Sequence, residues 1–553
     1  MADRANIAAF LPHMAAERPT QPAIVETIGR DAAGQRIFAT LTFAELDART
    51  DQIARGLLKL GMQRGERIVV LVKPSLDFFS VMFALWKAGL VPVLIDPGLG
   101  RKQLKQCLAE VAPHGFIGIP MAHVARVLLG WGKPTVRHLV TVGRRWLWGG
   151  ATLEEALRLG AHGDAVMAAT RGEDLAAVLF TSGSTGVAKG VEYQHRHFIA
   201  QVELIRATYG IVPGEIDLPT FPPFALFDPA LGMTTILPQM DFTRPANVDP
   251  LELLALIQQF QVTNVFGSPA LLATVSRHAE QTGAKWPTVR RVISAGAPAS
   301  VQTLERMQLL LPPDAQVFTP YGATECMPVS NVGSREVLEE TRAATEQGAG
   351  VCVGHVVAPN DVRIIAVDDG ALADWRDVTE LAVGEIGEIC VLGPTTTQAY
   401  FGRPQANALA KISAGDRLWH RMGDTGYLDA QGRLWYCGRK SHRVQMADRV
   451  LHTAPVEEVL NTHPAVRRTA LVPVTVEGVV QPLVCVEREP GHALADAPLF
   501  AELAALAQQF PATRGIVRFL TYPAFPVDIR HNAKIGREVL AVWAQERTTQ
   551  ERP

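Results

Sequence analysis

The sequence lacks the features of secreted and membrane-spanning proteins. Its 553 residues contain only six cysteines, and none of them forms a C-x-x-C pair. In a chain of this size such cysteines are interpreted as reduced, mostly buried thiols. No apolar run approaches the roughly 20 residues that are needed to span a bilayer. The N-terminal residues also lack the basic start, apolar stretch and cleavage site of a signal peptide. We therefore expect a cytoplasmic protein.

An excess of charge of either sign is absent as well. The 53 Lys and Arg residues nearly balance the 55 Asp and Glu residues, which leaves a formal charge of −2. Nucleic-acid-binding domains normally carry a clustered basic excess, so no nucleic-acid partner is expected, although the totals leave room for a local basic patch. Internal repeats and low-complexity segments are missing too. The length predicts two or more domains with a large buried core.

Strand-like apolar runs alternate with helical patterns along the first part of the chain. Residues 67–71 and 91–95 are apolar runs on either side of a helical pattern at 76–88. This order predicts a parallel βαβ unit that is buried on both faces of its sheet. Thr152 and Glu155 have the spacing of a capping box, which predicts that a helix begins there. The fold class predicted is α/β.

The pattern changes near residue 425, where an alternating segment with Gly432 predicts a hairpin. The elements predicted after it are a helix at 456–461, strands at 469–474 and 483–487, a helix at 499–509 and a strand at 516–521. Such a set can form a compact α+β unit of its own. We therefore predict a large N-terminal domain over residues 1–437, a hinge at 438–441 and a small C-terminal domain over 442–553.

The most informative segment is the loop at 180–190, F-T-S-G-S-T-G-V-A-K-G, which follows an apolar run. Its glycines let backbone N–H groups approach a ligand, its hydroxyls donate hydrogen bonds, and its lysine supplies positive charge. This composition predicts a polyphosphate-binding loop, although it is not a Walker A sequence and a flexible surface loop is the alternative. The residues predicted to contact the phosphates are Thr181, Ser182, Gly183, Ser184, Thr185, Gly186 and Lys189.

Segments farther along the chain have residue types that suit the rest of a nucleotide. Residues 321–325, Y-G-A-T-E, offer a flat aromatic ring, a hydroxyl and a carboxylate that can hold Mg²⁺ beside substrate phosphates. The small residues at 294–297 allow a planar ring to approach, and Asp424 and Arg439 can contact a sugar or a phosphate. Each segment alone is also compatible with a turn, a core tyrosine or a solvated salt bridge. The nucleotide-binding residues predicted here are Gly296, Ala297, Tyr321, Gly322, Ala323, Thr324, Asp424 and Arg439.

In this order and spacing, the motifs resemble those of the adenylate-forming superfamily, which includes acyl-CoA ligases, peptide-synthetase adenylation domains and luciferases. The resemblance covers nearly the whole chain and implies a large domain of stacked mixed sheets with helices, followed by a small mobile domain. It implies ATP and Mg²⁺ as cofactors and carboxylate attack on the α-phosphorus to form acyl-AMP. By the resemblance, Tyr321 stacks on adenine, Asp424 holds the ribose, and Glu325 and Thr185 bind the metal. The catalytic residues that it implies are Thr324, Glu325 and Lys534.

The chain departs from acyl-CoA ligases in the loop after Arg439. Ligases usually carry a glycine about ten residues into this loop, beside the thiol channel, whereas residues 439–450 contain none and Asp448 lies near that place. The departure makes CoA doubtful as the acyl acceptor, although drift in a tolerant loop is an equal alternative. Together with the strings at 221–232, 244–250 and 531–534, the loop looks most like the olefin β-lactone synthetases of bacterial long-chain olefin synthesis.

That resemblance implies adenylation of a long-chain 2-alkyl-3-hydroxy fatty acid, followed by internal ring closure to a β-lactone with release of AMP and pyrophosphate. Asp228 and His442 are candidates for the base that takes the hydroxyl proton. The alternatives are a long-chain fatty acyl-CoA or acyl-carrier ligase and a non-catalytic nucleotide-binding scaffold. Other olefin-pathway enzymes are expected partners. Residues 144–148, R-R-W-L-W, offer a surface for a partner or a membrane, or form a plain surface turn.

Overall fold

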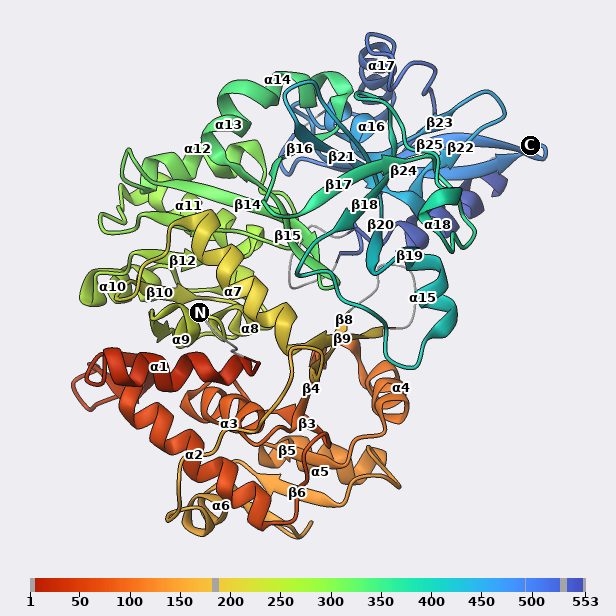
Figure 1. Ribbon diagram of the computed structural model, residues 1–553. Coiled ribbons are helices and arrows are strands. Elements are labelled where there is room, and N and C mark those ends of the chain that lie inside the picture. The colour runs from red at the N-terminus through yellow and green to blue at the C-terminus, as the bar shows by residue number, and fades with distance from the viewer. Residues whose placement is uncertain (1–4, 182–187, 493, 528–534, 551–553) are drawn as a thin grey trace.

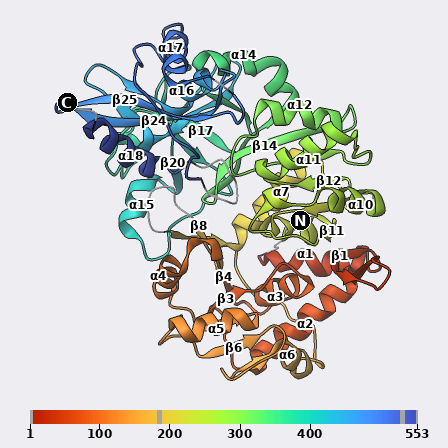
Figure 2. The ribbon, with the colours of Figure 1, turned by 180° about the vertical axis from the view of Figure 1, so that it is seen from behind.

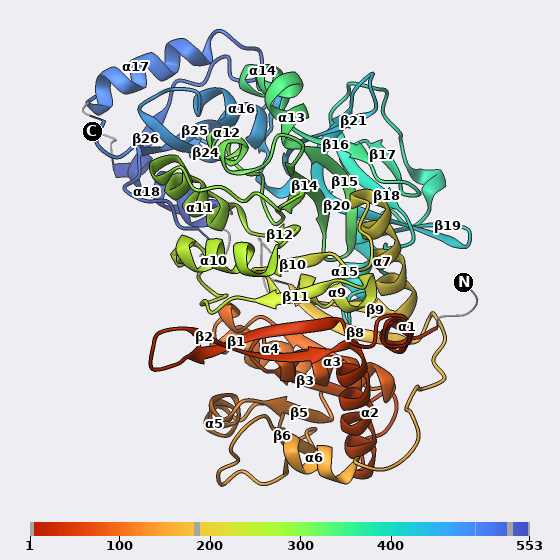
Figure 3. The ribbon, with the colours of Figure 1, turned by 90° about the vertical axis from the view of Figure 1, so that its left-hand side faces the viewer.

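The computed structural model describes residues 5–181, 188–492, 494–527 and 535–550 (Figure 1). A seven-stranded sheet in the described part of the chain forms one end of the molecule, opposite helix α17 (Asp496–Ala507) (Figures 2 and 3). Its core strands are parallel, and its edge is the antiparallel pair β8–β9, in which Thr181 lies opposite Lys189. In spatial order the strands are β7 (Ala151–Thr152), β6 (His138–Thr141), β5 (Gly115–Gly118), β3 (Arg67–Leu71), β4 (Val91–Ile95), β8 (Leu175–Thr181) and β9 (Lys189–Gln194).

Three of the helices at this end begin at a hydroxyl cap, which is supplied by Thr42, Ser75 and Thr152. The predicted βαβ unit is confirmed, because β3 pairs in parallel with β4 and α3 connects them. The capping box at Thr152 is also confirmed, since its hydroxyl accepts from the Glu155 N–H at 3.1 Å. The helices are α1 (Phe10–Glu17), α2 (Phe43–Lys59), α3 (Leu76–Lys87), α4 (Arg101–Val111), α5 (Pro120–Leu129) and α6 (Leu153–Leu159).

A second, larger sheet forms the middle of the molecule (Figure 1). Strands β12, β13 and β14 are parallel to one another, so their carboxyl ends meet at one edge, where open α/β sheets bind ligands. Beyond β14 the pairing is antiparallel. In spatial order the strands are β17 (Asp361–Ile365), β18 (Gly387–Leu392), β20 (Arg417–Leu428), β21 (Arg433–Arg439), β16 (Val351–Val356), β15 (Cys326–Gly333), β14 (Gln316–Ala323), β13 (Arg291–Ile293), β12 (Asn264–Phe266), β10 (Ile216–Pro219), β11 (Thr234–Leu237), β1 (Pro22–Arg30) and β2 (Arg36–Thr42), with β19 (Lys411–Ala414) on β20.

Helices cover this sheet and connect it to the first one. Helix α7 follows β9 directly and crosses from the first sheet to the second (Figure 3). The helices of this part are α7 (His195–Tyr209), α8 (Pro222–Ala225), α9 (Asp228–Leu231), α10 (Pro250–Phe260), α11 (Pro269–Thr282), α12 (Val301–Leu310), α13 (Ser334–Glu336), α14 (Arg342–Ala344) and α15 (Pro404–Ala410). Helices α7 and α11 each contain many buried residues, and the burial of these side chains holds both helices against the sheets.

The C-terminal unit has its own sheet and its own apolar core. Strand β21 ends at Arg439, and a short 3-10 turn at Lys440–His442 follows, at the place where the hinge is predicted. The exact domain boundaries stay a prediction. The prediction misses α18 and places the last strand over six residues, of which three are paired. The elements are β22 (Val444–Gln445), β23 (Val450–Leu451), α16 (Thr453–Leu460), β24 (Val466–Val476), β25 (Val479–Arg488), α17, β26 (Phe519–Thr521) and α18 (Arg537–Gln550).

Three expectations about the chain as a whole can be compared with the structure. All six cysteines are buried and free, which agrees with the prediction of mostly buried thiols. None of the helices in the described ranges is long and apolar enough to cross a membrane. The α/β class with a large sheet-containing part and a smaller C-terminal unit is confirmed.

Candidate active site

A large cavity of 2190 Å³ lies at the carboxyl ends of the parallel strands of the second sheet and extends to the C-terminal unit. Most of the described residues that the sequence predicts for the site line it: Lys189, Gly296, Ala297, Tyr321, Gly322, Ala323, Thr324, Glu325, Asp424, Arg439 and His442. Thr181 ends β8 directly before the phosphate loop. Ser182, Gly183, Ser184, Thr185, Gly186 and Lys534 lie outside the described residues. The strand order therefore brings together motifs that are far apart in the sequence.

The polar end of the cavity is organised around Asp424 in β20. Its Oδ2 accepts a hydrogen bond of 2.7 Å from the Tyr321 hydroxyl, and its Oδ1 lies 3.0 Å from Arg439 Nη1. Asp424 and Arg439 are register partners in adjacent strands, which explains the short contact. Burial raises the pKa of the Asp424 carboxyl, and the Arg439 guanidinium opposes that rise. The trio forms a fixed carboxylate flanked by an aromatic ring and a cation, a set that suits a nucleoside.

Glu325 contacts Tyr400, which pairs with the edge strand of the first sheet. Tyr400 forms an isolated antiparallel bridge with Val191 of β9, and its hydroxyl donates to Glu325 Oε1 at 2.6 Å. The Tyr400 ring also lies under Lys189, whose Nζ is 4.8 Å from the ring centroid. One tyrosine thus holds both the predicted metal ligand and the predicted phosphate-binding lysine. Burial raises the pKa of Tyr400, so its hydroxyl remains a donor.

The backbone of the β14–β15 turn is held from two sides. The Tyr193 hydroxyl of β9 donates to the carbonyl oxygen of Thr324. The carbonyl oxygen of Glu325 accepts from the Thr397 N–H at 2.9 Å. A Cβ on Gly322 would lie 2.7 Å from the Cys326 carbonyl oxygen, so the turn requires glycine there. These contacts fix Thr324 and Glu325 in the cavity wall.

The loop after β13 supplies the small residues of the wall. Gly296 has a φ of +96°, a backbone conformation that side chains disfavour. Both Gly296 and Ala297 line the cavity close to the Tyr321 segment. Both residues follow β13, the strand that pairs with β14, and that they make room for a planar base stays a prediction.

The opposite end of the cavity is apolar. Phe224 of α8 stacks on Phe266 at the end of β12, with ring centroids 4.0 Å apart and an angle of 19° between the planes. Phe221 and Phe227 flank this pair and also line the cavity. From the other side, α7 contributes Ile205 and its neighbours on the same helical face. Such a chamber can take long alkyl chains out of water.

Four residues that support this site are not predicted from the sequence: Tyr193, Gln201, Tyr400 and Lys411. Lys411 at the start of β19 is buried, and its Nζ donates to the carbonyl oxygen of Thr397. Burial lowers the pKa of Lys411 to about 8, and the nearby Glu325 carboxylate partly opposes this. In the sequence, Tyr400 is marked only as an aromatic residue shortly after three consecutive threonines. Its partners come from distant segments, so local patterns do not reveal them.

The two candidate bases lie in different surroundings. His442 lines the cavity, and its Nε2 lies 3.1 Å from Glu538 Oε1 of α18. Burial lowers the pKa of His442. Asp228 is buried in α9, accepts from the Thr235 hydroxyl at 2.9 Å, and is not among the residues that line the cavity. Burial and the neighbouring Asp217 carboxylate raise the pKa of Asp228 well above its usual range.

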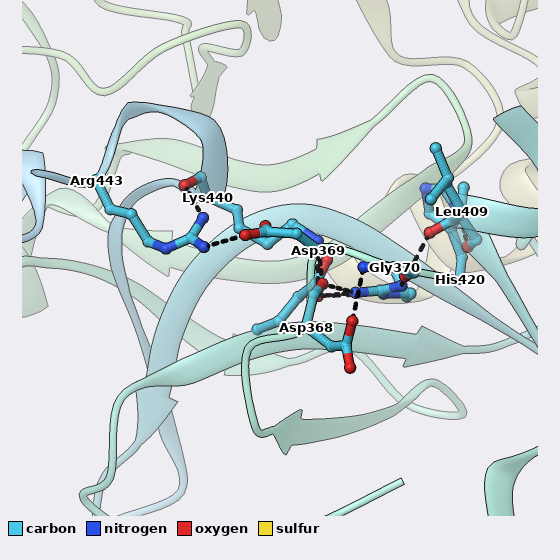
Figure 4. Close-up of polar contacts among 10 residues, drawn as sticks. Asp368, Asp369, Gly370, Leu409, His420, Lys440 and Arg443 are labelled. Carbon is cyan, nitrogen blue, oxygen red and sulfur yellow. Dashed lines mark hydrogen bonds and ion pairs between the residues drawn. The ribbon is translucent and has the colours of Figure 1, made fainter. Parts of the chain in front are cut away.

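Lys440 in the predicted hinge and Arg443 just after it are tied to the large domain. Lys440 Nζ lies 3.1 Å from the buried Glu388 and donates to the carbonyl oxygen of Asp368 at 2.8 Å. Arg443 reaches the Asp369 carboxylate at 2.5 Å, and Figure 4 shows both side chains at the turn formed by residues 368–370. These contacts hold the C-terminal unit over the cavity. Two residues of this unit, Ile535 and Arg537, line the cavity.

The carboxylates present fit a Mg²⁺ ion that is shared with phosphates. Among the described residues, no cluster of three or more His, Cys, Asp or Glu side chains could hold a metal by itself. Magnesium usually binds through one or two carboxylates together with substrate phosphates, and Glu325 offers one such carboxylate next to Lys189. Thr185, the other predicted ligand, lies outside the described residues.

Comparison with known proteins assigns the chain to a family. The family model described as AMP-binding enzyme matches residues 11–401, well over half of the chain. The chain belongs to the AMP-binding enzyme family. An olefin beta-lactone synthetase from Stenotrophomonas maltophilia (strain K279a) is 57% identical over 548 residues, which are 98% of each chain. A protein of the same name from Xanthomonas campestris pv. campestris is 55% identical over 551 residues, again 98% of each chain.

These relatives confirm the resemblance of this AMP-binding enzyme to olefin β-lactone synthetases. Among solved structures, the amide bond synthetase McbA from Marinactinospora thermotolerans aligns with a TM-score of 0.78 over 97% of this chain and 99% of its own. At 20% identity this likeness supports the fold alone. It confirms the predicted arrangement of a large sheet-containing part and a smaller C-terminal part.

Proposed function

We propose that this AMP-binding enzyme uses ATP to adenylate a long-chain 2-alkyl-3-hydroxy fatty acid and then closes the acyl-AMP to a β-lactone. The observation that carries the proposal is the continuity of the cavity, which joins Asp424 and Glu325 at one end to Phe224 at the other. One ligand can therefore place its carboxylate beside a nucleotide while its alkyl chains leave water. The high identity to proteins named olefin beta-lactone synthetase supports the same reaction.

In the first step, a carboxylate oxygen of the acid attacks the α-phosphorus of ATP, and the bond from this phosphorus to the pyrophosphate oxygen breaks. Tyr321 and Asp424 would bind the adenosine. Lys189 and Lys534 would face the charge that builds on the transferred group, where fixed charges are most effective. Glu325 would hold Mg²⁺, which when bound neutralises charge on the phosphates.

In the second step, the 3-hydroxyl oxygen attacks the carbonyl carbon, the bond from this carbon to the phosphate oxygen breaks, and AMP leaves with the electron pair. The nucleophile and the carbonyl belong to one molecule, and such reactions reach effective molarities of about 10⁵ M or more. Of the two candidate bases, His442 is the better one, because it lines the cavity and its lowered pKa keeps the ring neutral near pH 7. Asp228 has no such access.

Product analysis tests the proposal. The enzyme is incubated with ATP, Mg²⁺ and a 2-alkyl-3-hydroxy acid, with and without CoA, and the products are identified by mass spectrometry. A β-lactone together with AMP and pyrophosphate is expected in both samples. If a thioester forms, and only in the sample with CoA, the protein is a long-chain acyl-CoA ligase. If neither sample releases pyrophosphate, the protein is a non-catalytic nucleotide-binding protein.

We also propose that the enzyme is located in the cytoplasm and that other olefin-pathway enzymes are its partners. The six free, buried cysteines are compatible with a reducing compartment. In the aromatic loop before β7, Trp148 stacks on His123 and donates to Thr141, whereas Leu147 is fully exposed and Trp146 is half exposed. This exposed pair is available for a partner. Size-exclusion chromatography of mixed pathway enzymes tests the association, and independent elution of every enzyme would contradict it.

A further inference from the structure

An exposed apolar patch lies at the end of the molecule that contains α5, β6 and α6, opposite helix α17 (Figures 1 and 3). In the loop between β6 and β7, Leu147 is fully exposed and Trp146 is 53% exposed. On α5, Met121 and Leu128 are 65% and 77% exposed, and their spacing places them on one face of the helix. We call these four side chains the apolar patch. Apolar side chains that are exposed as a group, and not singly, indicate an interaction surface.

Ring contacts join the loop to α5, so the two parts of the apolar patch belong to one surface. The Trp148 indole stacks on His123 of α5, with ring centroids 5.2 Å apart, and the Trp146 ring lies 5.4 Å from the Trp148 ring. The Trp148 N–H also donates to the Thr141 hydroxyl at the end of β6, at 2.9 Å. Trp148 therefore anchors the loop on the protein, and its two neighbours Trp146 and Leu147 are left exposed to solvent.

The segment that carries the apolar patch has charge of one sign only. Residues 111–153 contain no Asp or Glu, and their basic residues are Arg126, Lys133, Arg137, Arg144 and Arg145. Lys133 and Arg144 are exposed and form no ion pair with any residue in the described ranges. Glu155, just beyond the segment, is already paired with Arg145 at 3.1 Å. Exposed apolar side chains among unpaired basic ones are complementary to anionic lipid headgroups above their acyl chains.

We propose that the apolar patch docks the enzyme on the surface of an anionic phospholipid bilayer. Trp146 and Leu147 enter the headgroup region, and Lys133 and Arg144 face lipid phosphates. A uniformly negative bilayer suits this surface better than a protein does, because protein surfaces normally mix charges of both signs. The inference rests on the proposed function only for its use, which is to bring the enzyme to the place where a long-chain acid leaves water.

Co-sedimentation of the full-length protein with vesicles, without substrate, tests the inference. We expect binding to vesicles of equimolar phosphatidylcholine and phosphatidylglycerol, about tenfold or more weaker binding to pure phosphatidylcholine, and release at high salt. Arg144→Gln is expected to weaken binding about fivefold, and the double variant Trp146→Ser, Leu147→Ser about tenfold or more. Binding to neither kind of vesicle, or equal binding to both, would overturn the inference.

Leu251→Ser is the matched control, because Leu251 is also an exposed leucine, at 58%, but lies on α10 in the middle part of the molecule. This variant is expected to bind vesicles as the wild type does, and all variants are expected to release pyrophosphate at the wild-type rate without vesicles. If the double variant binds vesicles normally but no longer co-elutes with pathway enzymes, the apolar patch is a protein interface and the inference is wrong. Vesicle binding requires no turnover, so failure of the proposed reaction is recognised separately.

Discussion

Replacement of Tyr400 by Phe isolates the contact that orients Glu325. The variant removes the hydroxyl that donates to Glu325 Oε1 at 2.6 Å but keeps the ring that lies 4.8 Å from Lys189 Nζ. A hydrogen bond to a charged group contributes about 1.5–3 kcal/mol, and 1.4 kcal/mol corresponds to a factor of ten. We therefore expect the Mg²⁺ concentration for half-maximal pyrophosphate release to rise about 10- to 100-fold, in line with other losses of support around a metal ligand.

The assay is a Mg²⁺ titration of pyrophosphate release at saturating ATP and acid. Tyr400→Leu serves as the companion variant, because it removes the ring as well and so also releases Lys189. We expect Tyr400→Leu to raise the KM for ATP in addition, whereas Tyr400→Phe leaves this KM within about twofold of wild type. Identical Mg²⁺ titrations of Tyr400→Phe and wild type would refute the assignment of Glu325 to the metal.

Asp424 and His442 are the ionisable groups of the cavity whose proposed roles substitution and pH separate. Asp424→Asn is expected to raise the KM for ATP about tenfold and to leave the KM for the acid nearly unchanged, because a charged acceptor that binds Arg439 and Tyr321 is lost; an unchanged KM for ATP would contradict the nucleoside site. Burial lowers the pKa of His442, so ring closure should be independent of pH above about pH 6.5 and slow down as the ring is protonated at lower pH. Single-turnover decay of acyl-AMP measures this, and a His442→Gln variant with the same pH profile would exclude His442 as the base.

The fold was predictable where local patterns act. Two apolar runs on either side of a helical pattern identified the β3–α3–β4 unit, and the capping box at Thr152 identified the start of α6. The long strands β24 and β25 were predicted too short, because they continue past the apolar residues through backbone pairing with each other. Pairing between strands is a tertiary interaction that the side-chain pattern records only in part.

The residues of the site also divide into those that local sequence patterns predict and those that only tertiary contacts reveal. Tyr321 and Asp424 lie 103 residues apart, and their common role came from resemblance to a family, since no local rule brings them together. Tyr400, Gln201 and Lys411 escaped prediction because their importance depends on partners in other elements. The neighbours of Asp228 in the sequence make it a candidate base, whereas the structure shows that its carboxylate accepts from Thr235 and does not line the cavity.

The central claim is that the second half-reaction is internal to the substrate. The most direct measurement is the fate of acyl-AMP formed without CoA from the 3-hydroxy acid and from its matched deoxy acid. We expect AMP and β-lactone to appear in equal amounts from the hydroxy acid, and enzyme-bound acyl-AMP to persist with the deoxy acid, which has no tethered nucleophile. If the acyl-AMP of both acids persists until CoA is added and then yields thioester, the enzyme is an ordinary ligase and the account is wrong.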